Sequence, residues 1–184
     1  MLLALAVVGC SRSERVAAPA AARIDETPPP AVEDSAREQL AIRAKGLAEV
    51  KAEMALASKV VECRVVSAFN KDYQQAKTKP RYKGYALLAQ REVPADQVAQ
   101  LIAILAAPEG YEPPGHESTC LPDPGYILSF ERTGHSVEIV VCFTCGDVWI
   151  HGVPGLKAVT LPMTAETSRV LWKHVEKHLA RGSA

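Results

Sequence analysis

Two cysteines in the second half of the chain have the spacing that most directly suggests chemistry. Cys142 and Cys145 form a Cys-x-x-Cys pair within VVCFTCGDVW, and Gly146 follows the second cysteine. A pair of this kind can bind a metal, cycle between dithiol and disulfide, or supply structural crosslinks. The compartment of the protein normally decides among these uses. The N-terminal residues carry the signal for that compartment.

The chain starts with an apolar run, MLLALAVVGC, and turns polar at once in SRSER. Such a run is typical of a secretory signal and is far too short to span a bilayer as a helix. Its end, Val7-Val8-Gly9-Cys10, resembles the lipobox of bacterial lipoproteins. This resemblance implies that residues 1–9 are a signal peptide and that Cys10 becomes the lipidated N-terminus. The alternative is a buried N-terminal strand or helix with an incidental cysteine.

The residues after the lipobox predict where the protein is held. Ser11 follows the cysteine, which resembles the pattern of lipoproteins sorted to the outer membrane and facing the periplasm. Residues 10–33 are rich in Ala and Pro and lack an apolar period, so we expect a lipidated tether, stiffened by three consecutive prolines at 28–30. Residues 34–184 then form a single domain, anchored to the membrane through the lipid.

The apolar periodicity of that domain predicts an α+β fold. A capping box at Ser35 opens a helix toward Ser58, and VVECRVVSAF alternates as a half-buried strand with Glu62 and Arg64 on its outer side. A weaker strand is expected over residues 85–89, a helix between Pro94 and Pro108, and a last helix capped by Thr164. We expect the helices to pack on one face of a small antiparallel sheet.

The segment YILSFERTGHSVEIVV is the clearest hairpin, with Thr133 and Gly134 as its turn. Leu128 and Phe130 should then share a buried face with Ile139 and Val141. The strand VWIHG is expected to follow the CFTCGD turn and complete a C-terminal meander.

Hairpin register also predicts where the cysteines gather. If Arg132 faces His135, Cys142 lies near Gly125, and Cys120 falls within about two residues of Cys145. In an exported domain, the four cysteines other than Cys10 favour disulfides, and their pairing stays open. The disulfide candidates are Cys63, Cys120, Cys142 and Cys145.

The entropy of loop closure favours a disulfide between Cys120 and Cys145 over one between Cys142 and Cys145. Closing the 26-residue loop from Cys120 to Cys145 stabilises the fold by about 3.5 kcal/mol, against about 1.9 kcal/mol for the loop from Cys142 to Cys145.

A metal site is the main alternative for the same sulfurs. A Cys-x-x-Cys-Gly turn between strands resembles the knuckle of zinc ribbons, which normally contain a second such pair. In this chain Cys120, Cys142 and Cys145 would bind zinc together with Cys63 or a histidine. The candidate histidines are His116, His135 and His151.

Thiol-redox activity is the third interpretation, and it is weaker. The pair lies between two strands, so the helix N-terminus that activates thioredoxin-type thiols is missing. A separate pair, His174 and His178, has the i, i+4 spacing of a metal clamp. Lys173, Lys177 and Arg181 surround it, and a solvated basic helix end is the favoured interpretation.

The stretch from CLPDPGY to CFTCGDVWI resembles a pattern in bacterial proteins of uncharacterised function, many of them lipoproteins. Those proteins share a Cys-x-Pro segment, an apolar hairpin and a Cys-Phe-x-Cys turn. The resemblance implies a domain type and no activity.

Composition limits the classes of partner. The chain has 184 residues, 21 basic and 21 acidic, and only 5% aromatic residues. A balanced charge and few stacking rings argue against nucleic-acid binding. We therefore expect a membrane-anchored envelope lipoprotein that acts as a binding or structural module, with an envelope protein as one candidate partner. It is expected to have no catalytic residues and no cofactor, with zinc as the alternative.

Overall fold

The protein is described here by a computed structural model that covers the backbone of residues 30–71, 73–115 and 123–179, with side chains from position 37 onward. The helices are α1 (Pro30–Ala55), α2 (Tyr73–Ala76), α3 (Ala95–Leu105) and α4 (Ala165–His178), with a short 3-10 turn, η1, at Pro108–Gly110. The strands are β1 (Lys59–Val66), β2 (Arg81–Tyr82), β3 (Tyr85–Glu92), β4 (Tyr126–Arg132), β5 (His135–Cys142), β6 (Asp147–His151) and β7 (Val159–Pro162).

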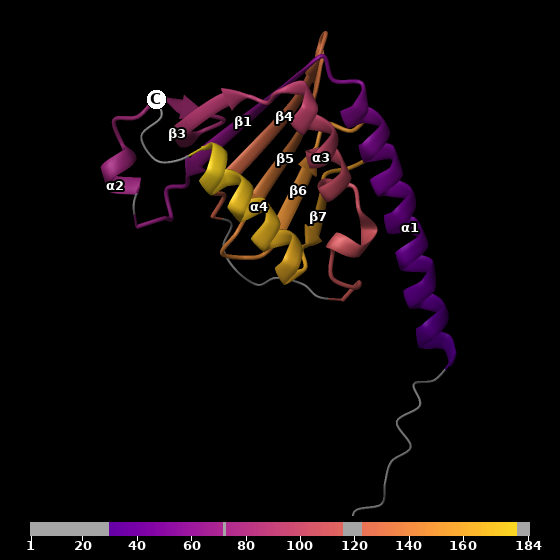
Figure 1. The fold of residues 1–184 in the computed structure, drawn as a ribbon. Helices are drawn as coiled ribbons and strands as arrows, with labels where there is room; N and C mark the ends of the chain where they lie inside the picture. The colour runs from indigo at the N-terminus through magenta and orange to yellow at the C-terminus, as the bar shows by residue number, and fades with distance from the viewer. Residues whose placement is uncertain (1–29, 72, 116–122, 180–184) are drawn as a thin grey trace, which may run out of the picture.

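The strands form one seven-stranded sheet in the order β2-β3-β1-β4-β5-β6-β7, and every pairing is antiparallel. Figure 1 shows α1, α3 and α4 side by side over one face of this sheet, with the N-terminal turns of α1 extending past it. The predicted α+β class, with helices on one face of an antiparallel sheet and a C-terminal meander, is confirmed. The meander runs from β4 to β7, one strand longer than expected.

The central hairpin has the predicted register. Arg132 pairs with His135 across the Thr133-Gly134 turn, and Tyr126 pairs with Val141. Gly134 has a φ of 72°, which this tight turn requires and which glycine adopts without steric cost. Because side chains alternate along strands, the register fixes which residues of β4 and β5 face the helices.

One large apolar core lies between the sheet and the helices. It contains Leu128, Phe130, Ile139 and Val141 of the hairpin, as expected. The three long helices contribute buried side chains: Leu47, Val50 and Met54 of α1, Leu101, Ile102 and Leu105 of α3, and Leu171 and Val175 of α4 with Leu179 directly after it. Sheet and helices therefore share a single hydrophobic contact surface.

The opposite face of the sheet carries a second, smaller apolar cluster. Val61, Cys63 and Val65 of β1 pack there against Ile127 and Val140. Tyr82, Tyr85, Leu87 and Trp149 lie partly buried against this cluster. Strand β1 is thus covered on both faces, and the expectation that it is only half buried was wrong.

Two helix predictions also need correction. Helix α1 already runs through Ser35, because it starts at Pro30, so the predicted start at a capping box was wrong. Proline suits the first turn of a helix, where its missing N–H costs no hydrogen bond. In α4, Thr164 caps the helix as predicted, with its hydroxyl accepting a hydrogen bond from the Thr167 amide at 3.2 Å. The apolar pattern of this helix predicts that Trp172 lies inward next to Leu171; this prediction was wrong, because Trp172 is 37% exposed.

In the ranges described, none of the helices combines the length and the apolar character needed to cross a bilayer. The predicted signal peptide, residues 1–9, and most of the predicted tether, residues 10–33, lie outside the described residues. So does Gly182, where the sequence predicts that the last helix stops.

Candidate functional site

The Cys-x-x-Cys pair forms a tight turn between two strands. Strand β5 ends at Cys142 and β6 begins at Asp147, which pair directly across the ladder. The Gly146 amide donates to the Cys142 carbonyl oxygen at 2.9 Å, and glycine adopts there a φ of 74°. The Cys145 amide donates to the Cys142 sulfur at 3.1 Å, so the turn brings a backbone donor to the first sulfur.

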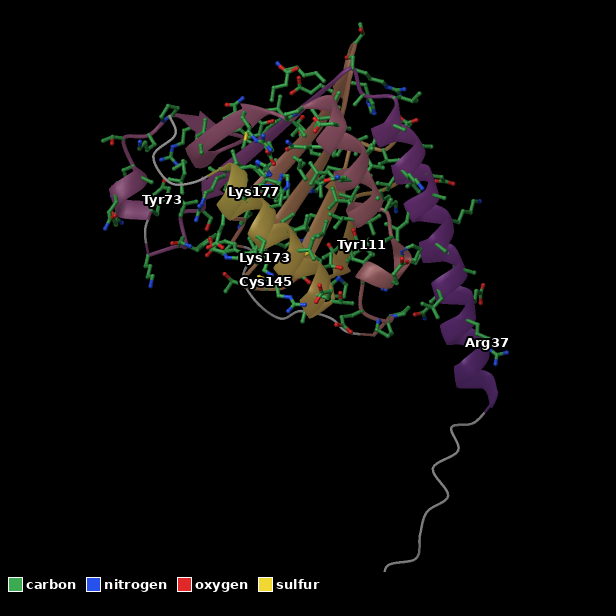
Figure 2. All side chains as sticks on the ribbon, in the orientation of Figure 1. Arg37, Tyr73, Tyr111, Cys145, Lys173 and Lys177 are labelled. Atoms are coloured by element: carbon green, nitrogen blue, oxygen red, sulfur yellow. The ribbon has the colours of Figure 1, made fainter. Side chains whose placement is uncertain are left out.

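The described cysteines do not all have the same chemical state. Cys63 and Cys142 are free, buried thiols, whereas Cys145 is disulfide-bonded. Cys120 lies outside the described residues. Figure 2 shows Cys145 at the end of the sheet below α4.

Cys63 lies away from the turn, in the middle of β1. It pairs with Ile127 of β4 and belongs to the small apolar cluster that contains Val140. Burial, with smaller contributions from Glu62 and Glu131, raises the pKa of the Cys63 thiol to about 12. A thiol in this environment stays protonated and is a poor nucleophile or metal ligand.

The histidines proposed for a zinc site are dispersed. His135 is at the turn end of β5, the end opposite Cys142, and His151 ends β6 in an exposed position. Within the described part of the chain, no three His, Cys, Asp or Glu side chains are grouped so that they could hold a metal. His116 and Cys120 lie outside it. A zinc site that uses Cys120, Cys142 and Cys145 stays a prediction, and it would require the disulfide of Cys145 to be reduced.

Glu62 carries a buried carboxylate beneath α4, and the sequence did not reveal its burial or its partners. The Glu62 side chain on β1 is fully buried, and both of its oxygens have partners. Tyr126 donates a hydrogen bond to Oε2 at 2.5 Å, and His174 Nε2 lies 2.8 Å from the same oxygen. Arg91 forms an ion pair with Oε1 and also donates to the Gln97 side-chain oxygen at 2.8 Å.

Burial and the neighbouring polar groups have opposite effects on the pKa of the Glu62 carboxyl. Burial alone would raise the pKa of this carboxyl. Hydrogen bonds from His174 and Tyr126, together with the charges of His174 and Arg91, outweigh burial and lower the pKa. Because every oxygen is already bonded, the carboxylate is arranged to hold α4 and β3 to β1 rather than to accept a proton from a substrate.

The histidine pair of α4 therefore has a different role from the one predicted. Lys173 and Lys177 lie on the outward face of the helix, as Figure 2 shows, and are exposed. His174 points inward to Glu62, so the interpretation as a solvated basic helix end was wrong for this residue. The His178 ring lies 4.7 Å from the His174 ring, and burial lowers its pKa, with the charge of Arg91 adding to the effect.

An apolar groove that could hold a ligand lies between α1 and the β7 edge of the sheet. Its volume is about 330 Å³. Ile42, Leu47 and Val50 of α1 form one wall, and the other is formed by Ile150, Val159 and Leu161. Leu156 and Pro114 complete the apolar lining. The volume falls in the range of small-molecule sites, and so does the preponderance of apolar side chains.

Two residues of α1, Gly46 and Arg43, determine the open space and the charge of this groove. Gly46 has no atom within 4 Å of the place where a side-chain carbon would be, so close packing does not require glycine there. Arg43 is the one charged residue among the described residues of the lining, and its guanidinium donates to the Glu112 carbonyl oxygen. The groove thus combines open apolar space with a single cationic group.

The amino-acid sequence contains only a partial signal for the groove. An apolar stripe at positions 40, 44, 47, 50 and 54 predicts that one face of α1 packs on the core, and Leu47, Val50 and Met54 are buried there. Leu40, expected on the same stripe, is 48% exposed, and the groove-lining Ile42 is 65% exposed. Of these two exposed apolar side chains, only Ile42 borders the groove.

Comparison of the chain with protein-family models, with curated proteins and with solved structures gave no match in any of the three.

Proposed function

We propose that this chain is a lipid-anchored protein of the bacterial cell envelope whose domain binds an apolar ligand in the groove beside α1. The lipobox-like Val7-Val8-Gly9-Cys10 and Ser11 support lipid attachment at the outer membrane, facing the periplasm. The Ala/Pro-rich residues that follow support a spacer between the lipid and the domain. A binding role rather than a catalytic one fits a site without a free acid, base or nucleophile among its described lining residues.

The observation that carries the binding role is the groove itself. Its lining includes Leu47, Val50, Ile150 and Leu161, which belong to the buried core, whereas Ile42 on α1 is 65% exposed to solvent. Exposed apolar surface of this kind raises the free energy of the unliganded protein, and a bound hydrocarbon would remove it from water.

The binding role is tested with a neutral apolar probe. We expect N-phenyl-1-naphthylamine to bind the purified protein saturably, at one site, with an increase in fluorescence. Gly46→Leu, which places a branched side chain in the open space of the groove, should abolish this binding. Gly46→Ala is the matched control and should keep it, because a methyl group there meets no atom within 4 Å.

Non-saturable binding, or binding that is equal in the wild type and Gly46→Leu, would contradict the proposed role. Gly46→Leu should not lower the melting temperature, since leucine is a better helix former than glycine, so a loss of binding could not be ascribed to unfolding.

Lipid attachment is tested by intact mass. Protein exported through its own leader should lack residues 1–9 and carry the added mass of acyl groups, and Cys10→Ala should be neither cleaved at this position nor acylated. An unmodified mass with Met1 still present would show that the apolar run is not a lipoprotein signal.

The second candidate function uses the sulfurs of the Cys-x-x-Cys turn, in a zinc site or a thiol-redox couple. It is favoured by the Cys145 amide that points at the Cys142 sulfur, because such a donor stabilises a metal-bound or free thiolate. The disulfide bond of Cys145 weighs against both uses, because a sulfur in a disulfide has no thiolate to offer. We propose that its partner is Cys120, the pairing with the greater loop entropy.

Peptide mapping under non-reducing conditions separates these two possibilities. A peptide that joins Cys120 to Cys145, in protein free of bound metal, supports the crosslink. One equivalent of zinc that is lost in Cys142→Ser would support the metal site.

A further inference from the structure

We infer that the groove beside α1 takes the hydrocarbon chain of a single-chain fatty acid, with Arg43 binding its carboxylate. This inference rests on the proposed binding role of the groove and names the class of ligand.

The lining argues for a hydrocarbon chain rather than a peptide. A bound polypeptide brings an N–H and a C=O group at almost every residue, and each loses free energy if it is buried without a hydrogen bond. The described walls are formed by aliphatic side chains, and Gln39 and Arg43 are the only lining residues with polar side chains. A methylene chain has no such groups to satisfy, and it gains from each one that is buried.

The charge of the groove argues for an anionic head. Of the described lining residues, none is an Asp or Glu, whereas Arg43 contributes a guanidinium. One of its nitrogens, Nη1, donates to the Glu112 carbonyl oxygen, which fixes the side chain at the groove. A guanidinium has five N–H donors, so this bond leaves others to bind a carboxylate.

The size of the groove argues for one chain. A volume of about 330 Å³ is at the lower end of the range for small-molecule sites, which suits one acyl chain better than the two chains of a phospholipid. Gly46 contributes to this space, because any larger residue at its position would project into it. Glycine within a helix lowers helix stability, and here no close contact explains it, so open space at position 46 has a use in binding.

The experiment compares two ligands that differ only in the head group. The mature chain from position 10, with Cys10→Ser so that no detergent is needed, is titrated by calorimetry with dodecanoate and with dodecanol, below micelle-forming concentrations at pH 8. We expect dodecanoate to bind at least ten-fold more tightly, as the bond between guanidinium and carboxylate adds to the same chain contacts.

Substitutions at Arg43 and Gly46 test where the carboxylate and the hydrocarbon chain of the ligand bind. Arg43→Gln should remove the preference for dodecanoate while leaving dodecanol binding within about two-fold. Gly46→Leu should lose both ligands, and Gly46→Ala should retain both with the preference unchanged.

The outcomes distinguish failure of this inference from failure of the binding role. If dodecanol binds the wild type as tightly as dodecanoate, the carboxylate assignment is overturned and the groove remains an apolar binding site. If neither ligand binds, both proposals are overturned.

Two further outcomes would assign another occupant and overturn the inference. One is binding to phosphatidylglycerol vesicles without binding to dodecanoate. The other is a dimer that dissociates on Gly46→Leu substitution and is unaffected by dodecanoate, which would show that a second copy fills the groove.

Discussion

At the scale of single residues, Glu62 shows how far a buried charge depends on its partners. A carboxylate removed from water is costly unless hydrogen bonds and opposite charges replace its hydration. Glu62 obtains both, from Tyr126 and His174 on one oxygen and from Arg91 on the other. Its partners come from β4, α4 and β3, so the network links three elements to the central strand.

We predict that Glu62→Gln lowers the free energy of unfolding at pH 7 by about 3 kcal/mol, because Arg91 and His174 lose a buried anionic partner. The matched control is Glu92→Gln, an exposed residue of the same sheet paired with Lys59, which should change stability by less than about 0.5 kcal/mol. Urea unfolding followed by circular dichroism measures both. Equal effects of the two substitutions would contradict a structural role for the Glu62 network.

The same network predicts a pH dependence. A lowered pKa means that the folded state holds the Glu62 proton less tightly than the unfolded chain does. The contribution of Glu62 to the free energy of unfolding is therefore fully present above the ordinary pKa of 4.5. It is lost as the pH falls through the lower pKa of the folded protein. Unfolding free energies between pH 3 and pH 7 should decline more steeply on the acid side in the wild type than in Glu62→Gln.

Cysteine reactivity is a second prediction at this scale. Cys63 and Cys142 are both fully buried, and the pKa of Cys63 is raised to about 12, so neither should react with iodoacetamide in the native protein near neutral pH. Both should react after unfolding in urea, and mass mapping identifies each modified site. Rapid native labelling of Cys63 would show that β1 is not covered on both faces.

At the scale of elements, glycine-dependent turns fix how the strands of the meander meet. Gly134 and Gly152 both have positive φ values, of 72° and 82°. They differ in their surroundings: a side-chain carbon at Gly134 would meet no atom within 4 Å, whereas one at Gly152 would lie 2.1 Å from the Ser136 carbonyl oxygen. The exit of β6 thus lies against the backbone of β5.

This pair predicts a difference between two otherwise similar substitutions. Gly134→Ala should cost about 1 kcal/mol, from backbone strain alone. Gly152→Ala should cost clearly more, about 3 kcal/mol or above, because the strain is combined with a clash against backbone that has to move. Thermal unfolding of the two variants measures the difference, and similar melting temperatures would contradict the close approach of β6 to β5.

Helix α1 packs on the core with one part of its length and borders the groove with another. Its C-terminal half buries Leu47, Val50 and Met54 in the core, whereas the turns around Arg43 border the groove. The end of the groove defined by Arg43 is tied to the loop after η1 through the Glu112 carbonyl. One helix therefore both closes the core and forms the proposed ligand site.

At the scale of the whole molecule, one core joins the three long helices to the sheet. Side chains from α1, α3 and α4 belong to one cluster with buried residues of β4, β5 and β6. The other apolar clusters among the described residues are the small ones around β1 and β3. Such a domain should unfold in one cooperative step.

We predict that far-ultraviolet circular dichroism and tryptophan fluorescence give the same urea midpoint and the same slope. The two tryptophans report on different places, since Trp172 is on α4 and Trp149 is packed against the cluster on the opposite face of the sheet. Single-tryptophan variants, each with the other replaced by Phe, assign the signals. A separate transition for Trp149 would show that the opposite face unfolds independently.

The fold was largely predictable because its strongest signals are local. Alternation in the hairpin gave the correct register, down to the pair of Arg132 and His135. The apolar period of α3 and the Thr164 cap of α4 are also readable within a few residues. The fourth strand of the meander, β7, has four residues and no clear alternation, so its sequence alone did not reveal it.

The candidate sites were less predictable, since they depend on contacts between distant segments. The Glu62 carboxyl and the His174 ring are 112 positions apart in sequence, and nothing near either residue indicates the other. Alternation placed Glu62 opposite Cys63 correctly, but it could not show that a helix covers the Glu62 face. The groove likewise joins residues of α1 to β6 and β7, about a hundred positions further along.

By itself, the sequence of this protein determined the antiparallel hairpin, the helical segments and the turn between Cys142 and Cys145, whereas the export signal and the lipid anchor stay predictions. The hairpin, the helical segments and the turn follow from periodicity, capping and short spacings, which act over a few residues. Only the tertiary structure decided which polar side chains are buried and which apolar ones remain exposed, because burial depends on elements that meet from distant parts of the chain. Glu62 and the groove beside α1 are the clearest results of that packing.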